Sequence, residues 1–140
     1  MAKSISNKTA GNRFEQELCD RLKEYGFWSH NMAQTEVGQP ADIIAVKNDW
    51  AILIDCKLCQ KDYFPLSRIE PNQEAAMTYW KSCKNSTAWF AIKVKGNDTI
   101  YILIWETAKK CLDCGLSSII PSIECHTLEW MLNRPERKQT

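Results

Sequence analysis

Hydrophobic and polar positions follow two different periods along this chain, and the change of period marks its elements. Over residues 10–25 the apolar side chains recur every three or four positions, which predicts an amphipathic helix that stops at Gly26. Residues 43–46 and 51–54 are instead continuous apolar runs of strand length. Such runs are typical of strands in the middle of a sheet that is covered on both faces.

The four residues between these two runs predict a tight hairpin, with Asn48 and Asp49 as its central turn residues. Shorter patterns predict the remaining elements, which are a short edge strand at 27–33, a loop at 34–40, a polar loop at 59–69, a helix at 71–82, strands at 87–94 and 99–105, a helix at 107–112, an apolar stretch at 119–120 and a helix at 128–132. This order predicts an α/β (α+β) fold, with a central mixed sheet flanked by helices.

Composition places the chain among ordinary globular proteins. It has 140 residues, of which 44% are hydrophobic and 25% charged, so we expect one domain over residues 10–132 with a flexible basic arm at 1–9 and a frayed tail at 133–140. The net charge is only +1, so an anionic partner must be met by a local basic patch. No apolar run is long enough to span a membrane, and residues 1–8 lack the apolar core of a secretory signal. We therefore expect a cytoplasmic protein whose seven cysteines are reduced thiols.

Two acidic residues stand at matching ends of the hairpin strands. If Asn48 and Asp49 form the turn, Asp42 lies directly opposite Asp55 on one side of the sheet, and alternation puts Lys57 on the same face as Asp55. Opposed carboxylates destabilise a sheet unless a charge cancels theirs, and Mg²⁺ is commonly held by one or two carboxylates. Two carboxylates that hold a metal, with an ammonium beside them, are the outline of a site that cleaves phosphodiesters. The alternative is a solvent-exposed hairpin end with Lys57 as a salt-bridge partner.

Two helical residues could complete such a site. On the first helix, Glu15 lies beside the apolar stripe, whereas Glu17 lies towards solvent, where it can pair with Arg21. On the second helix, Gln73 falls on the apolar face, although a glutamine in a first turn is often only a capping residue.

These residues resemble the motif of the PD-(D/E)XK nuclease superfamily, which has an acid on a leading helix, Pro-Ala-Asp on one strand and Asp-x-Lys on the next. In this sequence the motif is Glu15, 40–42 and 55–57. The helix around Glu15 resembles the opening helix of archaeal and phage Holliday junction resolvases. The segment 64–69 with the following Gln73 is similar to the bacterial resolvases of the recombination-protein-U type. The resemblance covers roughly residues 10–95, and it departs from the family pattern at Asp55, where the resolvases usually have glutamate.

The resemblance implies a restriction-endonuclease-like core with the order αβββαβ, and hydrolysis of DNA phosphodiester bonds with Mg²⁺, for which Mn²⁺ substitutes. It implies that Asp42, Asp55 and Glu15 bind the metal, that Lys57 orients or activates the attacking water and that Gln73 sits beside Lys57. It also implies a homodimer, because two copies related by a two-fold axis cut the strands of a four-way junction symmetrically. No small-molecule cofactor and no membrane partner are expected.

Basic and aromatic residues near this motif suit a nucleic-acid surface. Lysine and arginine bind phosphates, and aromatic rings stack on exposed bases. The candidates for DNA contact are Lys8, Arg13, Lys61, Tyr63 and Arg68. Phe64 stands among them but equally suits the core.

Two other interpretations of the sequence remain open. The enzyme could be a phage or mobile-element nuclease for flaps, ends or unspecified duplex, since junction selectivity depends on surface shape. In a different class, the chain could be a non-catalytic DNA-binding or inhibitor protein with structural zinc. The ligands for that zinc would be two CxxC pairs, Cys56 with Cys59 and Cys111 with Cys114.

Overall fold

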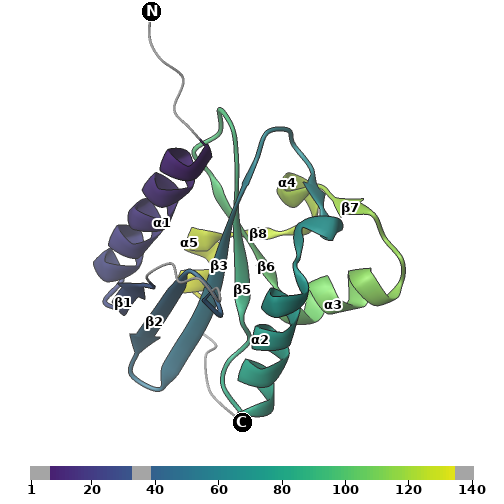
Figure 1. Cartoon of the computed structure of the whole chain (residues 1–140). Helices are drawn as coiled ribbons and strands as arrows, with labels where there is room; N and C mark the ends of the chain where they lie inside the picture. The colour runs from purple at the N-terminus through teal and green to yellow at the C-terminus, as the bar shows by residue number, and fades with distance from the viewer. Residues whose placement is uncertain (1–6, 33–38, 135–140) are drawn as a thin grey trace, which may run out of the picture.

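The computed structural model describes residues 7–32 and 39–134, and a six-stranded mixed sheet lies at its centre (Figure 1). The strands lie in the order β1 (Trp28–Asn31), β2 (Ile43–Lys47), β3 (Trp50–Cys59), β5 (Trp89–Val94), β6 (Ile100–Ile104) and β8 (His126–Thr127). Only β3 and β5 pair in parallel among these neighbours. The described part therefore confirms the predicted mixed sheet and the core order αβββαβ.

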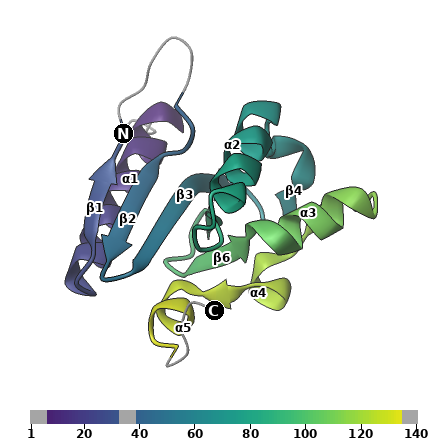
Figure 2. The same cartoon turned by 90° about the horizontal axis from the view of Figure 1, so that it is seen from below.

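Helices cover both faces of this sheet (Figures 1 and 2). On one face, α1 (Asn7–Glu24) and α5 (Leu128–Leu132) pack on a buried cluster that includes Ile52 and Ile54. On the other face, α2 (Pro71–Ser82) and α3 (Trp105–Asp113) pack on a second cluster that includes Leu53 and Phe90. Consecutive residues of β3 thus enter different clusters, as expected for a strand that is buried on both faces.

The hairpin of β2 and β3 has the predicted register. Ile43 pairs with Ile54 and Lys47 pairs with Trp50, which leaves Asn48 and Asp49 as the turn. Asn48 has a φ of 54°, a left-handed conformation that asparagine tolerates better than most residues. Beyond Ile54, β3 continues without a partner on the β2 side, while β5 follows it on the other side as far as Cys59.

The predicted polar loop at 59–69 is wrong. Cys59 ends β3, and the segment then forms β4 (Phe64–Pro65) and a 3-10 turn, η1 (Leu66–Arg68). Phe64, Leu66 and Ile69 are buried, so Phe64 belongs to the core. A two-residue strand is too short to show a period, and β4 forms because it pairs with a remote partner, β7 (Ser118–Ile119).

Several predicted boundaries also change. Helix α1 begins at Asn7, so residues 7–9 are not part of an arm, and Trp105 starts α3 instead of ending a strand. The short elements α4 (Pro121–Glu124) and β8 were not predicted. The rest of the predicted arm, positions 34–38 of the predicted loop and residues 135–140 of the predicted tail lie outside the described residues.

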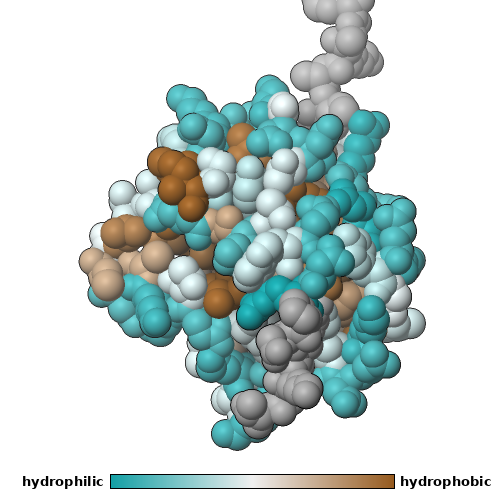
Figure 3. Space-filling model, turned by 180° about the vertical axis from the view of Figure 1, so that it is seen from behind, coloured by the Kyte–Doolittle hydropathy of each residue, from teal (hydrophilic) through white to brown (hydrophobic). Residues whose placement is uncertain are grey.

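The surface combines charged side chains with one apolar region. Figure 3 shows hydrophobic side chains gathered on the side of the molecule that carries α4 in Figure 1. In the segment from α3 to α4 the exposed large apolar residues are Leu116, Ile120 and Ile123, the last of them 75% exposed. Among the described helices none is long and apolar enough to cross a membrane.

The burial of Phe64 predicts a strong contrast with its neighbour Tyr63, which is 41% exposed. We expect Phe64→Ala to lower the free energy of unfolding by about 3–5 kcal/mol, because it leaves a cavity in the core. Tyr63→Ala should change it by less than about 0.5 kcal/mol. Urea unfolding followed by circular dichroism measures both, and equal effects would contradict the assignment of Phe64 to the core.

Candidate active site

Asp42 and Asp55 come together at the point where β2 ends and β3 continues alone. The last ladder bond on this side runs from the Asp42 amide to the Ile54 carbonyl, at 3.0 Å. The next free amide of β3, that of Cys56, donates to Asp42 Oδ2 at 2.7 Å. Asp42 and Asp55 are only 8% and 4% exposed, so the alternative of a solvent-exposed hairpin end is wrong.

Lys57 is held by three oxygens on the α2 side of the sheet. Its Nζ donates to the Arg68 carbonyl and to Gln73 Oε1, both at 3.0 Å, and lies 3.2 Å from Asp55 Oδ2. Lys57 is 7% exposed, and a buried ammonium needs such partners to offset its lost hydration. These contacts fix the position of the ammonium beside the two carboxylates.

Gln73 has both of the roles that its position suggested. As part of a capping box, its Oε1 accepts from the Glu70 amide at 3.0 Å, at the start of α2. The same oxygen accepts from Lys57, and its Nε2 donates to Asp55 Oδ1 at 3.3 Å. Gln73 therefore ties the first turn of α2 to both buried charges of β3.

Glu15 approaches from the opposite layer. It lies on α1, and burial raises its pKa to about 7, with a further rise caused by the negative charge of Asp42. A hydrogen bond with the Asn31 side chain acts in the other direction. The site thus combines groups from α1, from the ends of β1 and β2, from β3 and from α2. Glu17 has the predicted surface role, 4.0 Å from Arg21, and also pairs with Lys93 at 2.7 Å.

The charges of the site favour a cation. Burial raises the pKa of Asp55, the Lys57 ammonium lowers it and Asp42 raises it again, so the ammonium does not fully compensate the acids. Apart from its ion pair with Lys57 at 3.2 Å, Asp55 Oδ2 accepts no hydrogen bond from the described residues. Two adjacent carboxylates fit a divalent cation, whose other ligands are commonly water and phosphate. Among the described residues no three His, Cys, Asp or Glu side chains form a metal site, so Glu15 does not join the two aspartates as a third ligand in this structure.

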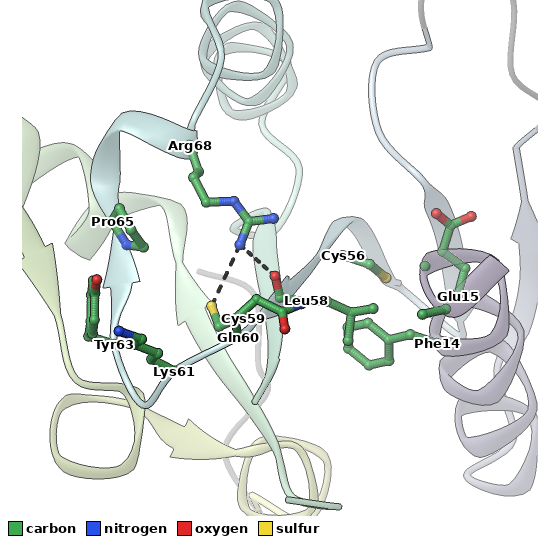
Figure 4. A pocket seen from close by; sticks show the side chains of 12 residues that line it. Phe14, Glu15, Cys56, Leu58, Cys59, Gln60, Lys61, Tyr63, Pro65 and Arg68 are labelled. Atoms are coloured by element: carbon green, nitrogen blue, oxygen red, sulfur yellow. Dashed lines mark hydrogen bonds between the residues drawn. The ribbon is translucent and has the colours of Figure 1, made fainter. Parts of the chain in front are cut away.

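A groove of about 540 Å³ runs along the free edge of β3 beside Glu15 (Figure 4). Lys61, Tyr63 and Arg68 line it, three of the five predicted DNA contacts. At the wall of this groove the Arg68 guanidinium donates hydrogen bonds to the Leu58 carbonyl and to Cys59 Sγ. Of the other two, Arg13 lines an adjoining groove of about 650 Å³, and Lys8 is exposed on the first turn of α1.

Three contributors were not predicted from the sequence. Gln39 donates to Asp42 Oδ1 at 3.3 Å, Asn31 lies beside Glu15, and Arg68 provides its carbonyl to Lys57. Alternation along β1 could have indicated Asn31, because it shares a face with Ser29, which donates to a carbonyl of α1. No sequence pattern indicates a backbone carbonyl.

The structure does not assemble the zinc site that the two CxxC pairs suggested. Cys56 and Cys59 lie on β3, while Cys111 and Cys114 lie at the end of α3, and the described residues contain no cluster of metal ligands. All seven cysteines, each within the described part, are free thiols. Burial raises the pKa of the Cys56 thiol well above its usual value, which favours the neutral form.

The comparisons with known proteins concern the family and the fold. A family model described as archaeal Holliday junction resolvase (Hjc) matches residues 6–132. The structure is similar to that of Hjc from Archaeoglobus fulgidus, a Holliday junction resolvase from an archaeal hyperthermophile, with a TM-score of 0.57 and 20% identity over 69% of this chain and 78% of that one. No curated protein matches the chain.

The raised pKa of Asp55 predicts how stability depends on pH. Because the folded chain holds this proton more tightly than the unfolded chain does, the stabilisation is present below the ordinary pKa of 3.8 and is lost as pH rises through the folded pKa. In EDTA, the unfolding free energy of the wild type should therefore fall more steeply from pH 5 to pH 8 than that of Asp55→Asn, by on the order of 1–2 kcal/mol. Urea titrations at both pH values measure this, with Asp49→Asn in the exposed turn expected to follow the wild type. Parallel curves for all three proteins would contradict the raised pKa.

Proposed function

The chain belongs to the archaeal Holliday junction resolvase family, and we propose that its site around Asp42 and Asp55 cuts four-way DNA junctions with the help of a divalent cation. Members of this family are DNA endonucleases, so the chain is a phosphodiester hydrolase that acts on DNA. The proposal concerns the residues, the metal and the assembly that carry out this activity.

The observation that carries the proposal is the buried Asp42–Asp55 pair with a fixed ammonium beside it. Burying two carboxylates and one ammonium costs free energy that a hydrophobic strand would avoid. Glu15 lines the groove of about 540 Å³, and so does Cys56, the residue between Asp55 and Lys57 on β3, so the buried charges lie next to this groove. A cluster of buried charges that costs stability and lies beside a groove is typical of a catalytic site.

In our proposal, Asp42 and Asp55 hold Mg²⁺ or Mn²⁺, and Glu15 moves closer to complete the ligand set. When bound, the cation stabilises charge that develops on the phosphate and makes water a better nucleophile. Its three oxygen partners hold Lys57 Nζ in one place, and Lys57 orients the attacking water by turning one of its three donors from the protein to the water. Gln73 keeps Lys57 and Asp55 in register by bonding to both.

The proposal extends to DNA contacts and to assembly. We assign phosphate binding to Lys8, Arg13, Lys61 and Arg68, and stacking or sugar contact to Tyr63 on the rim of the groove. We further propose a homodimer, because symmetric cutting of a junction needs two sites related by a two-fold axis. The exposed apolar residues Leu116, Ile120 and Ile123 offer a contact surface for the second copy.

Cleavage of a synthetic four-way junction tests the assignment of the site. With Mg²⁺ we expect symmetric nicks in the junction and far slower cutting of a linear duplex of the same sequence. Asp55→Asn should lower the single-turnover rate by on the order of 10³-fold, since it removes a ligand that stabilises transition-state charge. Asp49→Asn is the matched control and should cut like the wild type.

Each other outcome has a defined meaning. Equal cutting of junction and duplex would keep the nuclease but replace junction selectivity with the flap or duplex alternative. Full activity of Asp55→Asn would overturn the assignment of the site. No cutting by the wild type with either metal would favour a non-catalytic DNA-binding role.

Metal binding can be measured without DNA. A ligand that binds only the folded state raises its stability, so Mn²⁺ should raise the melting temperature of the wild type and leave the double variant Asp42→Asn/Asp55→Asn unchanged. The increase should be larger at pH 8 than at pH 5.5, because protons compete with the metal for the carboxylates. Asp49→Asn should again match the wild type. Equal increases in the double variant would place the metal elsewhere.

A further inference from the structure

The first helix contains a glycine that the packing of the protein does not explain. Gly11 lies in the interior of α1, where glycine is less favourable than alanine. A Cβ built on it would meet no atom of the described residues within 4 Å. Its φ is not in the left-handed region, in contrast to Gly26, Gly96 and Gly115. Neither close packing nor backbone conformation within the described chain requires a glycine here.

Gly11 lies directly on the approach to Glu15. The two residues are four apart on α1, so they are neighbours on one face of the helix, and both line the groove of about 540 Å³. The adjoining groove of about 650 Å³ shares Ala10, Phe14 and Leu58 with it. Together the two grooves form a continuous depression around the start of α1, at the end of the molecule where the β3–β4 connection and the β5–β6 turn also lie (Figure 1).

Free cations surround this depression. Arg13, Lys61 and Lys95 line the two grooves, and none of them forms an ion pair with an acid of the described residues. Lys93 is neutralised by Glu17, and Asp98 is the other acid in the second groove. If Glu15 at the proposed metal site is left out, unpaired cations outnumber the single unpaired acid, Asp98, among the described residues that line the two grooves.

We propose that the sugar–phosphate backbone of a DNA strand crosses α1 at Gly11 on its way to Glu15, and that the missing side chain is what allows this close approach. Glycine is the residue that lets another backbone come near. Arg13 and Lys61 then bind the flanking phosphates on the two sides of the crossing. This inference rests on the proposed function. It adds Gly11 as a residue that lets a DNA strand lie directly against α1.

The test uses substitutions that should stabilise the protein while they weaken DNA binding. Gly11→Ala should raise the melting temperature by roughly 2–4 °C, because alanine is the better helix former. The same change should raise the Kd for a labelled four-way junction in EDTA by about five-fold, and Gly11→Met by about 100-fold, as the strand is pushed away from α1. The slope of log Kd against log salt concentration should also become shallower, by about one for each phosphate that moves out of reach of its lysine or arginine.

Asn12→Ala is the matched control. Asn12 is exposed, lines neither groove and is a poorer helix former than alanine, so this variant should gain stability and keep the wild-type Kd and salt dependence. Gly11 variants that gain stability and bind and cut the junction like the wild type would overturn the inference and leave the proposed function standing. A wild-type protein that bound no junction would overturn both.

Discussion

The structure depends on one strand, β3, that extends beyond the end of its neighbour β2. After Ile54, β3 loses β2 but keeps β5, so its amides and carbonyls on one side need partners that the sheet does not provide. Asp42 accepts from the Cys56 amide, and the Arg68 guanidinium donates to the Leu58 carbonyl. Two residues thus complete the interrupted ladder. Asp42 is one of the two proposed metal-binding carboxylates, and Arg68 lines the groove. The side chains that bond to the unpaired backbone groups of β3 are therefore also side chains of the proposed site.

The position of the Lys57 ammonium depends on segments that are remote from β3 in the sequence. Lys57 reaches its carbonyl and amide acceptors only because η1 and the first turn of α2 meet above β3. The segment that contains η1 is itself held by the remote strand β7 and by a bond from the Leu66 amide to the Ser117 carbonyl. The segment after α3 thus supports the ammonium from a distance, although none of its side chains belongs to the site.

Much of this could be predicted from the sequence, because it depends on local rules. The turn at Asn48 and Asp49 sets the hairpin register, which pairs Ile43 with Ile54 and so brings the adjacent Asp42 close enough to Asp55 to raise its pKa. Alternation places Lys57, and the helical angle distinguishes Glu15 from Glu17. The 59–69 segment could not be predicted, because β4 exists only through its pairing with a strand more than fifty residues away. The Arg68 carbonyl that accepts from Lys57 belongs to the backbone, so no pattern of side chains could predict its role. The suggestion of a zinc site failed because spacing alone does not bring β3 and α3 into contact.

The two-sided construction of the site has a consequence for how the chain matures. Glu15 is carried by the layer on one face of the sheet and Gln73 by the layer on the other, and the strand that joins them is buried between two separate hydrophobic clusters. A chain in which only the α1 layer has packed lacks the acceptors that fix Lys57, and a chain in which only the α2 layer has packed lacks Glu15. On the proposed assignment, the site is therefore complete only when both halves of the core have packed on the sheet.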